Sequence, residues 1–294
     1  LLVVAVLGLV ATLAIGEVRG GSRRWIDLGP VSLQASEFAK FAVVVFLADV
    51  MARKERWLQH FGHVFWPVAA SLGVVGALLL AQPDLGTTLL IAGSVFAILL
   101  ASATPVRHVF KLALVGGAGA VFLAYAQPYR WERVTSFLNP DADPLGSGLQ
   151  ALQSLVALGT GGWFGVGLGA SRARWFFLPN AHTDFIFAII GEETGLAGSL
   201  IVVALFMLFA VVGIGVAMRA PDVFGRLLAV GIVSWLSIQA LVNIGGVTRV
   251  LPITGVPLPF VSSGGSAMLV NMAVVGVLVN IARSRGRRAA GGGR

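Results

Sequence analysis

Long runs of apolar residues recur along the chain and are separated by short polar or charged segments. About 20 apolar residues in a helix cross the hydrocarbon core of a bilayer. Eight runs approach this length, at 1–16, 37–52, 64–81, 86–103, 108–126, 184–217, 224–245 and 263–282. The pattern predicts an all-α polytopic membrane protein with eight transmembrane helices. Because the first run begins at Leu1 without a charged leader region, we interpret it as a shortened span of a truncated chain.

The composition supports the membrane interpretation. Hydrophobic residues make up 57% of the 294 residues and charged residues 12%, with a mean hydropathy of +0.89. Soluble domains have roughly 45–50% apolar and about 25% charged residues, so the composition excludes a soluble globular protein. The chain contains no cysteine, which excludes disulfide scaffolds, cysteine-ligated metal sites and cysteine nucleophiles.

The basic residues predict the orientation of the spans. Alternate connections and the tail contain twelve of the 21 Lys and Arg residues: Arg53, Lys54, Arg56, Arg107, Lys111, Arg219, Arg226, Arg283, Arg285, Arg287, Arg288 and Arg294. By the positive-inside rule, that side is cytoplasmic. The other nine fall on the outer side, where topology does not require them: Arg19, Arg23, Arg24, Lys40, Arg130, Arg133, Arg172, Arg174 and Arg249. The net charge of +8 therefore indicates orientation and an anionic substrate, with no nucleic acid as a partner.

The longest connection, 127–183, lies on the predicted outer side. Loops of this length are functional or disordered. The aromatic residues Trp131, Trp163 and Trp175 and the apolar stretch 149–158 favour short amphipathic helices along the membrane face. We expect one integral-membrane domain at 1–285 and a flexible cytoplasmic tail at 286–294.

A charged segment leads into the second span. Glu37 and Lys40 are three residues apart and share one helix face. One interpretation is an interfacial ion pair on a helix that Ser36 caps, because charged side chains near span ends reach toward water. The other is an anion site containing Arg23, Arg24 and Lys40, since guanidinium groups match phosphate oxygens. The sequence leaves both open.

A second polar segment, 82–88, joins two spans with the residues QPDLGTT. Proline, aspartate and glycine in this order are typical of a tight turn. An aspartate directly before a helix accepts hydrogen bonds from the free amides of its first turn. We therefore predict that Asp84 caps the following helix.

The most informative segment is LPNAHTDFIFAIIGEE at 178–193. Asp184 stands where the outer loop enters a span, either as a first-turn acid behind a Thr183 cap or as a functional carboxylate. Glu192 and Glu193 lie about 12–13 Å deeper at 1.5 Å per residue, where acids mark function or a buried polar partner. His182 and Asp184 lack a further spaced ligand, so a metal site is poorly supported. Signatures of serine hydrolases, nucleotide-driven pumps and zinc proteases are missing from the sequence.

The chain resembles the SEDS family of polytopic cell-wall proteins, whose members include FtsW and RodA, over 1–285. The resemblance is carried by GSRRWIDLGPVSLQASEFAK at 21–40, QPDLGTT at 82–88, the segment 130–198 and LPITGVPLPFVSSGGSAMLVNM at 251–272. Ala181 before His182 is more similar to the FtsW-like division members than to RodA. The resemblance implies a ten-helix fold of which eight helices are present. It also implies polymerisation of lipid II into glycan strands on the outer face of the cytoplasmic membrane during cell division, releasing undecaprenyl pyrophosphate.

The resemblance also implies site residues and partners. Asp184 matches the essential carboxylate of the family, and Glu37 and Lys40 match an important polar pair. The candidate substrate-binding residues are Arg23, Arg24, Trp25, Glu37, Lys40, Arg172, Arg174, His182, Thr183, Arg249, Ser262 and Ser263. Expected partners are lipid II, membrane lipid, a class B penicillin-binding protein and other divisome proteins; Mg²⁺ or another divalent cation stays open as a cofactor.

The implied chemistry fits one carboxylate. Transfer of a sugar from an α-linked pyrophosphate to a β-linked product inverts the anomeric centre, so a single base can deprotonate the acceptor hydroxyl during one displacement. Two other functions stay open. A lipid II flippase would use Glu37, Lys40, Glu192 and Glu193 as a polar path, and a non-catalytic divisome scaffold would not need Asp184 for polymerisation.

Overall fold

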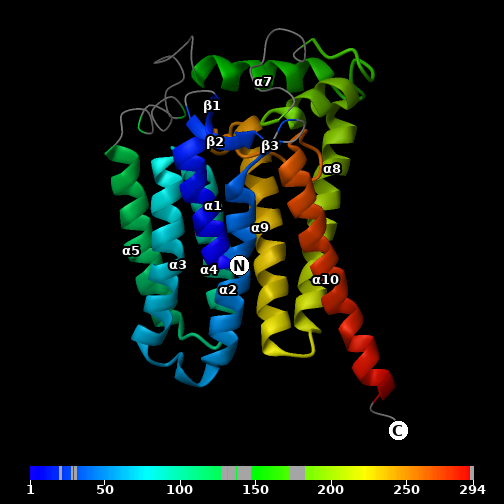
Figure 1. Cartoon of the computed structure of the whole chain (residues 1–294). Helices are drawn as coiled ribbons and strands as arrows, with labels where there is room; N and C mark the ends of the chain where they lie inside the picture. The colour runs from blue at the N-terminus through cyan, green and yellow to red at the C-terminus, as the bar shows by residue number, and fades with distance from the viewer. Residues whose placement is uncertain are drawn as a thin grey trace. The chain divides into compact units, whose positions relative to one another are not determined.

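The structure is a computed structural model, and it describes residues 1–19, 22–27, 29, 32–126, 131, 137, 147–172 and 183–291. Most of these residues are helical (Figure 1). The described ranges contain the helices α1 (Leu2–Ile15), α2 (Ala35–Arg53), α3 (Phe61–Ala81), α4 (Leu85–Ala101), α5 (Val106–Tyr125), α7 (Ser147–Gly161), α8 (Ile186–Met218), α9 (Val223–Val247) and α10 (Gly265–Gly291). A short 3-10 helix, Glu55–Trp57, follows α2.

Each of the eight predicted spans overlaps one of these helices. Five helices within the described ranges are long and apolar enough to cross a membrane, namely α3, α5, α8, α9 and α10. The apolar helices α1 and α4 are shorter, with 14 and 17 residues, and α2 carries Glu37, Lys40, Asp49 and Arg53. A mostly helical protein with several membrane-length helices is confirmed, whereas the number of eight spans stays a prediction.

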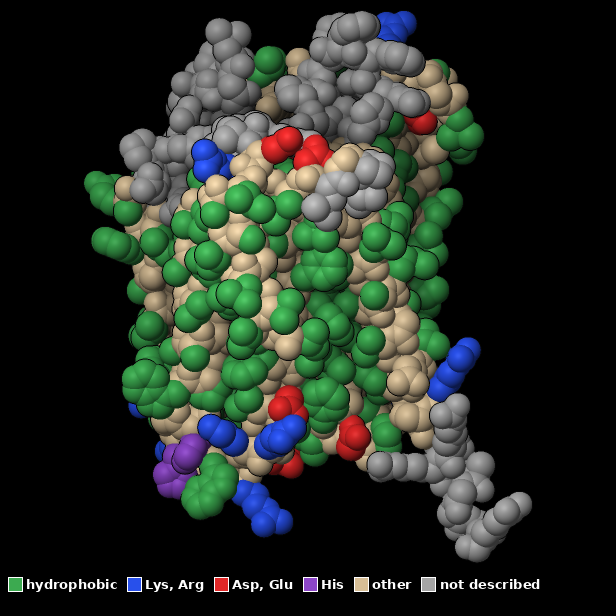
Figure 2. All heavy atoms as spheres, in the orientation of Figure 1, with side chains coloured by type: hydrophobic (Ala, Val, Ile, Leu, Met, Phe, Trp, Pro, Cys, Tyr) green, Lys and Arg blue, Asp and Glu red, His purple; other side chains and the backbone are tan. Residues whose placement is uncertain are grey.

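The surface of the helices fits a lipid environment. Figure 2 shows hydrophobic side chains along the helices and charged side chains gathered near helix ends. In α8, the apolar side chains of Leu200, Leu205, Leu208 and Val211 are each more than half exposed. Such a surface would be unfavourable in water over the length of a helix. The chain is therefore a multi-pass membrane protein.

Three short strands join α1 to α2, which the all-helical prediction did not include. The strands β1 (Glu17–Arg19), β2 (Ser22–Asp27) and β3 (Ser32–Leu33) form an antiparallel sheet in the order β1-β2-β3. Strands of three, six and two residues are too short to show a clear alternation of apolar and polar residues. Their pairing depends on partners within the sheet, which explains why the sequence pattern did not reveal them.

The chain divides into two compact units. Unit 1 comprises residues 1–113, 209–238 and 265–294, and unit 2 comprises residues 114–208 and 239–264. The helices α5, α8 and α9 each contribute residues to both units.

In unit 1, α2 packs against α1, α3 and α4. Its buried face includes Val43, Val44 and Leu47, all at most 1% exposed. Gly231 of α9 allows a close approach in this core, because a Cβ atom at this position would lie 2.6 Å from Val44 Cγ1. Trp235, also on α9, is fully buried. This packing fixes the start of α2, where the charged pair predicted from the sequence lies.

In unit 2, α7, the first part of α8 and the end of α9 surround a second core. Its buried members are Ala157, Phe185, Phe187, Ala188, Ile189, Ala240, Val247 and Leu258. Ser154 of α7 also donates a hydrogen bond to the carbonyl oxygen of Val247 at 3.0 Å. The predicted amphipathic helix around 149–158 is thus confirmed as α7, and it packs beside the entry of α8.

Candidate functional site

Asp184 lies in a turn directly before α8, as the sequence predicts. Asp184 is half-buried, and its backbone carbonyl accepts a hydrogen bond from Asn243 Nδ2 at 2.8 Å. The same nitrogen donates to the carbonyl of Val256 at 2.7 Å. One side chain of α9 therefore connects the turn that carries Asp184 to the segment 252–258, which has neither helix nor strand.

A small pocket opens beside Asp184. Its lining comes from the turn before α8, the end of α9 and the segment after it: Asp184, Phe185, Val242, Asn243, Gly246, Val247, Ile253, Thr254, Gly255 and Val256. Gly255 adopts a φ of +69° and faces Asp184, because a Cβ atom there would lie 3.5 Å from Asp184 Oδ2. Glycine takes this backbone conformation without the steric cost of other residues. The side of the carboxylate that faces residue 255 therefore meets a glycine without a side chain.

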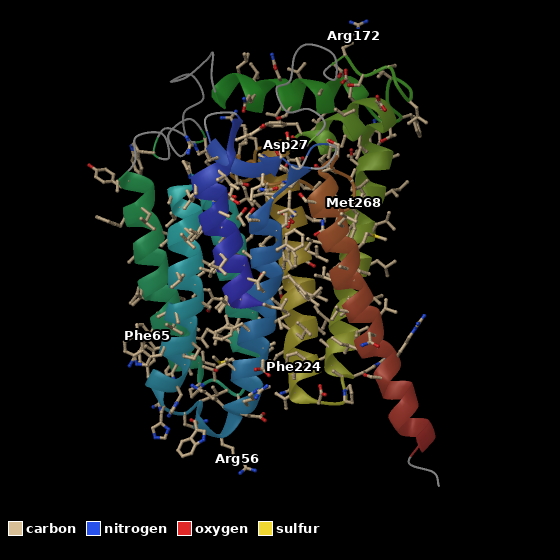
Figure 3. The ribbon with its side chains drawn as sticks, in the orientation of Figure 1. Asp27, Arg56, Phe65, Arg172, Phe224 and Met268 are labelled. Carbon is tan, nitrogen blue, oxygen red and sulfur yellow. The ribbon has the colours of Figure 1, made fainter. Side chains whose placement is uncertain are left out.

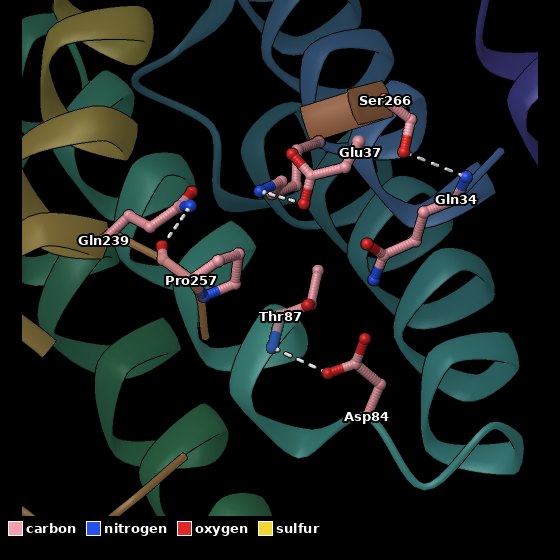
Figure 4. Close-up of polar contacts among 8 residues, drawn as sticks. Gln34, Glu37, Asp84, Thr87, Gln239, Pro257 and Ser266 are labelled. Atoms are coloured by element: carbon pink, nitrogen blue, oxygen red, sulfur yellow. Dashed lines mark hydrogen bonds and ion pairs between the residues drawn. The ribbon is translucent and has the colours of Figure 1, made fainter. Parts of the chain in front are cut away.

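The segment 252–258 forms the wall of the pocket because its sequence prevents a helix. Pro252 and Pro257 lack an amide hydrogen, and Gly255 takes the left-handed conformation. Gln239 of α9 holds the segment, since its Nε2 donates to the carbonyl of Pro257 at 2.9 Å (Figure 4). Asn243 holds the neighbouring carbonyl. Gln239 and Asn243 were not among the predicted site residues, although two side-chain amides four residues apart in an apolar helix indicate a buried polar site.

In unit 1, Glu37 and Lys40 form the predicted pair on one face of α2. Lys40 Nζ lies 2.8 Å from Glu37 Oε1, with each side chain 2% exposed (Figure 4). Lys40 Nζ also lies 4.8 Å from the ring centroid of Trp235, within the range of a cation–π contact. The expectation of an interfacial pair reaching toward water is wrong, because both charges are enclosed by protein.

The predicted Ser36 cap is also wrong. The N-cap residue of α2 is Gln34, without a side-chain capping bond, and Ser36 Oγ is buried with no hydrogen-bond partner among the described residues. Gln34 is held differently, because its backbone amide donates to Ser266 Oγ of α10 at 3.3 Å (Figure 4). The predicted cap of the next polar segment is confirmed, since Asp84 Oδ1 accepts from the amide of Thr87 at 3.1 Å.

Two arginines of unit 1 that the sequence predicts on the outer side contact backbone carbonyls. Arg24 donates through Nε to the carbonyl of Gln82 at 3.2 Å and through Nη2 to the carbonyl of Pro83. Arg23 Nη1 donates to the carbonyl of Leu13 at 3.4 Å. Lys40 pairs with Glu37, and an anion site formed by Arg23, Arg24 and Lys40 stays a prediction. Arg24 ties β2 to the turn between α3 and α4.

Glu192 has a buried polar partner, one of the two outcomes predicted for it. It is 4% exposed and accepts two hydrogen bonds, from Ser171 Oγ at 2.5 Å and from the amide of Arg172 at 3.1 Å. Glu193 Oε1 is buried, and within the described part of the chain it has no partner. The two adjacent acids therefore differ, and Glu192 anchors the end of the glycine-rich loop 162–171.

The loop 162–171 docks on a break in α8. At Gly195 the backbone leaves the helical conformation, with φ 70° and ψ −166°. The amides of Val166 and Gly167 donate to the carbonyls of Glu192 and Glu193 at 2.9 and 3.2 Å. Two further amides after the break donate back to carbonyls of the loop. The loop thus satisfies backbone groups that the interruption of α8 leaves unpaired.

The remaining predicted site residues lie in several separate segments of the chain. Arg172 is exposed and points away from the helices (Figure 3). Arg249 is half-buried after α9, with a φ of 60°. Trp25 lies in β2 opposite Glu17, and Thr183 precedes Asp184 in the same turn. Ser262 is buried and Ser263 exposed before α10.

Arg174 and His182 lie outside the described residues. Within the described ranges, no three His, Asp or Glu side chains converge as ligands of a metal ion. A divalent cation in the site stays a prediction from the chemistry of a pyrophosphate substrate.

Comparisons with known proteins show the family of the chain. The profile of the FtsW, RodA and SpoVE family, described as cell cycle protein, matches residues 1–287. Stage V sporulation protein E of Bacillus subtilis is 44% identical over 94% of this chain and 76% of that protein. A probable peptidoglycan glycosyltransferase FtsW of Geobacter sp. (strain M18) is 41% identical over 95% of this chain and 76% of that protein.

Solved structures show the same fold. A chain from work on the coordination of polymerization and crosslinking by a peptidoglycan synthase complex superposes with a TM-score of 0.78 and 29% identity, over 96% of this chain and 79% of that chain. The rod shape determining protein RodA of Thermus thermophilus gives a TM-score of 0.69 and 27% identity, over 97% of this chain and 77% of that chain.

Proposed function

The chain belongs to the FtsW, RodA and SpoVE family of cell cycle proteins, and from this premise we propose that it is a peptidoglycan glycosyltransferase. It polymerises lipid II into glycan strands and releases undecaprenyl pyrophosphate. The reaction takes place on the outer face of the cytoplasmic membrane during cell division. The relatives named FtsW at about 41–44% identity support this activity and the division role.

The observation that carries the proposal is the placement of Asp184 in the lining of a small pocket, opposite Gly255. Its Oδ2 faces Gly255, which has no side chain, and the pocket is lined by both residues. A carboxylate within hydrogen-bond reach of a hydroxyl can act as a general base. The acceptor hydroxyl then loses its proton to Asp184 as its oxygen bonds to the anomeric carbon. The bond from that carbon to the pyrophosphate breaks, and the pyrophosphate leaves with the electron pair.

The departing pyrophosphate gains negative charge and needs cations close to it. The arginines predicted on the outer side are the candidates for this role. Arg172 presents an exposed guanidinium, and Glu192 fixes its backbone amide. Arg249 lies in the same unit after α9. We assign them as substrate-binding residues, whereas Arg24 serves first to hold the turn after α3.

The contacts of the buried acids favour an enzyme over a lipid II flippase. A polar path would need acids that face a continuous route. Glu192 instead accepts bonds from Ser171 and Arg172, and Glu37 is paired with Lys40. These carboxylates have local structural partners instead of facing a continuous route.

A crosslinking partner is part of the proposal. The solved peptidoglycan synthase complex is described as coordinating polymerization and crosslinking. A class B penicillin-binding protein would supply the crosslinking activity beside this chain. Other divisome proteins and membrane lipid complete the expected surroundings.

The test uses the protein with its penicillin-binding partner in proteoliposomes supplied with lipid II. Asp184→Asn should abolish glycan synthesis and keep the thermal unfolding midpoint. The matched control is Asp49→Asn, which makes the same chemical change at an exposed pair with Arg53 and should leave synthesis intact. Undiminished synthesis by Asp184→Asn would disprove the catalytic assignment. Lipid II flipping by the same variants, measured separately, distinguishes the flippase.

A further inference from the structure

The segment 252–258 borders the pocket without regular structure of its own, so other groups must hold it in place. Gln239 and Asn243 are four residues apart on α9 and therefore share one helix face. Both are buried, at 0% and 4% exposure. Each donates its side-chain amide to one of two adjacent carbonyls, those of Pro257 and Val256. The two amides form a matched pair that fastens the pocket wall to α9.

Asn243 does more than Gln239. A side-chain NH₂ group has two hydrogens, and Asn243 Nδ2 uses them for Val256 at 2.7 Å and for the carbonyl of Asp184 at 2.8 Å. At the start of α8, the amide of Ala188 donates to the carbonyl of Phe185, the residue after Asp184. Asp184 lies before the first residue of α8, and the bond to its carbonyl comes from Asn243 on α9, 59 residues away in the sequence.

The two polar atoms of the Asn243 side chain differ in their contacts: the nitrogen makes two hydrogen bonds, and the oxygen makes none with the described residues. Asn243 Oδ1 is buried, and in the described ranges no hydrogen-bond donor reaches it. A buried polar atom without a partner lowers stability, whereas the nitrogen of the same side chain satisfies two carbonyls. The side chain remains polar where its nitrogen joins the two walls of the pocket.

We propose that Asn243 is a positioning residue that fixes the backbone of Asp184 relative to the segment 252–258, and thereby aims the carboxylate at the acceptor hydroxyl. The proposal rests on the assignment of Asp184 as the base. The two bonds of Asn243 Nδ2 go to backbone carbonyls and not to the carboxylate. Asn243 sets the separation between the turn before α8 and Gly255, which determines where a hydroxyl can meet Oδ2. The bond from Gln239 to Pro257 holds the same wall and does not involve the turn that carries Asp184.

The experiment compares two variants in the complex with its penicillin-binding partner, with lipid II as the substrate. Asn243→Leu removes both donors at similar side-chain size, and Gln239→Met removes one donor from the same wall. Small displacements of a catalytic group can lower rates by about 100-fold. Asn243→Leu should lower kcat about 10–100-fold with little change in KM. Gln239→Met loosens the wall but keeps the bond from Asn243 to Asp184, so it should lower the unfolding temperature and reduce kcat clearly less than Asn243→Leu does.

Loss of the same fraction of kcat in both variants would overturn the proposal, because the effect would then follow from wall stability alone. An unchanged kcat in Asn243→Leu would also overturn it. If Asn243→Leu does not fold, Asn243→Ser is judged by the same criteria, since its short polar side chain leaves space in place of the amide. The unmodified protein and Asp184→Asn report separately on the proposed function: an inactive unmodified complex contradicts the glycosyltransferase assignment, not the positioning role.

Discussion

Glu37 and Lys40 form an ion pair of 2.8 Å in which each side chain is only 2% exposed. The two residues lie one helical turn apart at the start of α2. Water cannot solvate either charge, so each depends on the other. The pair contrasts with Asp49 and Arg53 of the same helix, which also lie 2.8 Å apart but are 41% and 78% exposed.

We expect Lys40→Met to destabilise the protein strongly. It leaves the carboxylate of Glu37 buried without its cation, a change that costs about 3–5 kcal/mol. The control Arg53→Met breaks the exposed pair and should cost at most about 1 kcal/mol. The measurement is denaturant unfolding in detergent micelles. A double variant, Glu37→Gln with Lys40→Met, should recover most of the stability; equal losses in the single and double variants would show that charge burial is not the cause.

Gly165 should be sensitive to a single added methyl group. A Cβ atom there would lie 2.1 Å from the carbonyl oxygen of Glu193, and its φ is +80°. Gly169 has a similar φ of +78°, but no atom lies within 4 Å of its Cβ position. Gly169→Ala should therefore cost about 1 kcal/mol for the backbone alone. Gly165→Ala should cost clearly more, because the loop must move off α8.

Thermal unfolding of the two alanine variants tests this difference directly. Similar losses would show that the loop does not dock tightly on α8. Hydrogen exchange at Leu196 and Ala197 provides a second readout, since their amides donate to the loop at 2.9 and 3.2 Å. Their protection should fall in Gly165→Ala and stay unchanged in Gly169→Ala.

Glu192 and Glu193 should respond differently to the same substitution. Glu192→Ala leaves the buried hydroxyl of Ser171 without its acceptor, which costs about 1–3 kcal/mol. Glu193→Ala removes a carboxylate whose buried Oε1 has no partner in the described structure, so it should change stability less. Unfolding in detergent gives the comparison. A larger loss for Glu193→Ala would contradict the anchoring role of Glu192.

The helices could be predicted from the sequence because a membrane span is a local pattern. A run of apolar residues needs no knowledge of its neighbours, and each predicted run became a helix. The cap by Asp84 was also predictable, because the acceptor and the Thr87 amide are three residues apart. The sheet between α1 and α2 was not predictable in the same way, since its short strands require partners from other segments.

The candidate site was predictable only in part, for the same reason. The family resemblance and the position of Asp184 before a span pointed to one residue. Its surroundings come from Asn243 and Gly255, which are distant in sequence and meet it through packing. The burial of Glu37 and Lys40 also depends on Trp235 of α9. A charge pattern alone cannot distinguish a buried pair from one that reaches toward water.

Asp84 caps α4 through one of its two carboxylate oxygens. Asp84 is 3% exposed; its Oδ1 accepts from the Thr87 amide at 3.1 Å, and its Oδ2 has no partner among the residues described. Asp84→Ala should cost about 0.5–2 kcal/mol, because the first turn loses an acceptor. Asp84→Asn keeps a capping oxygen and removes a buried charge, so it should be as stable as the unmodified protein in thermal unfolding. If Asp84→Asn loses as much as Asp84→Ala, the carboxylate charge and not the cap stabilises this turn.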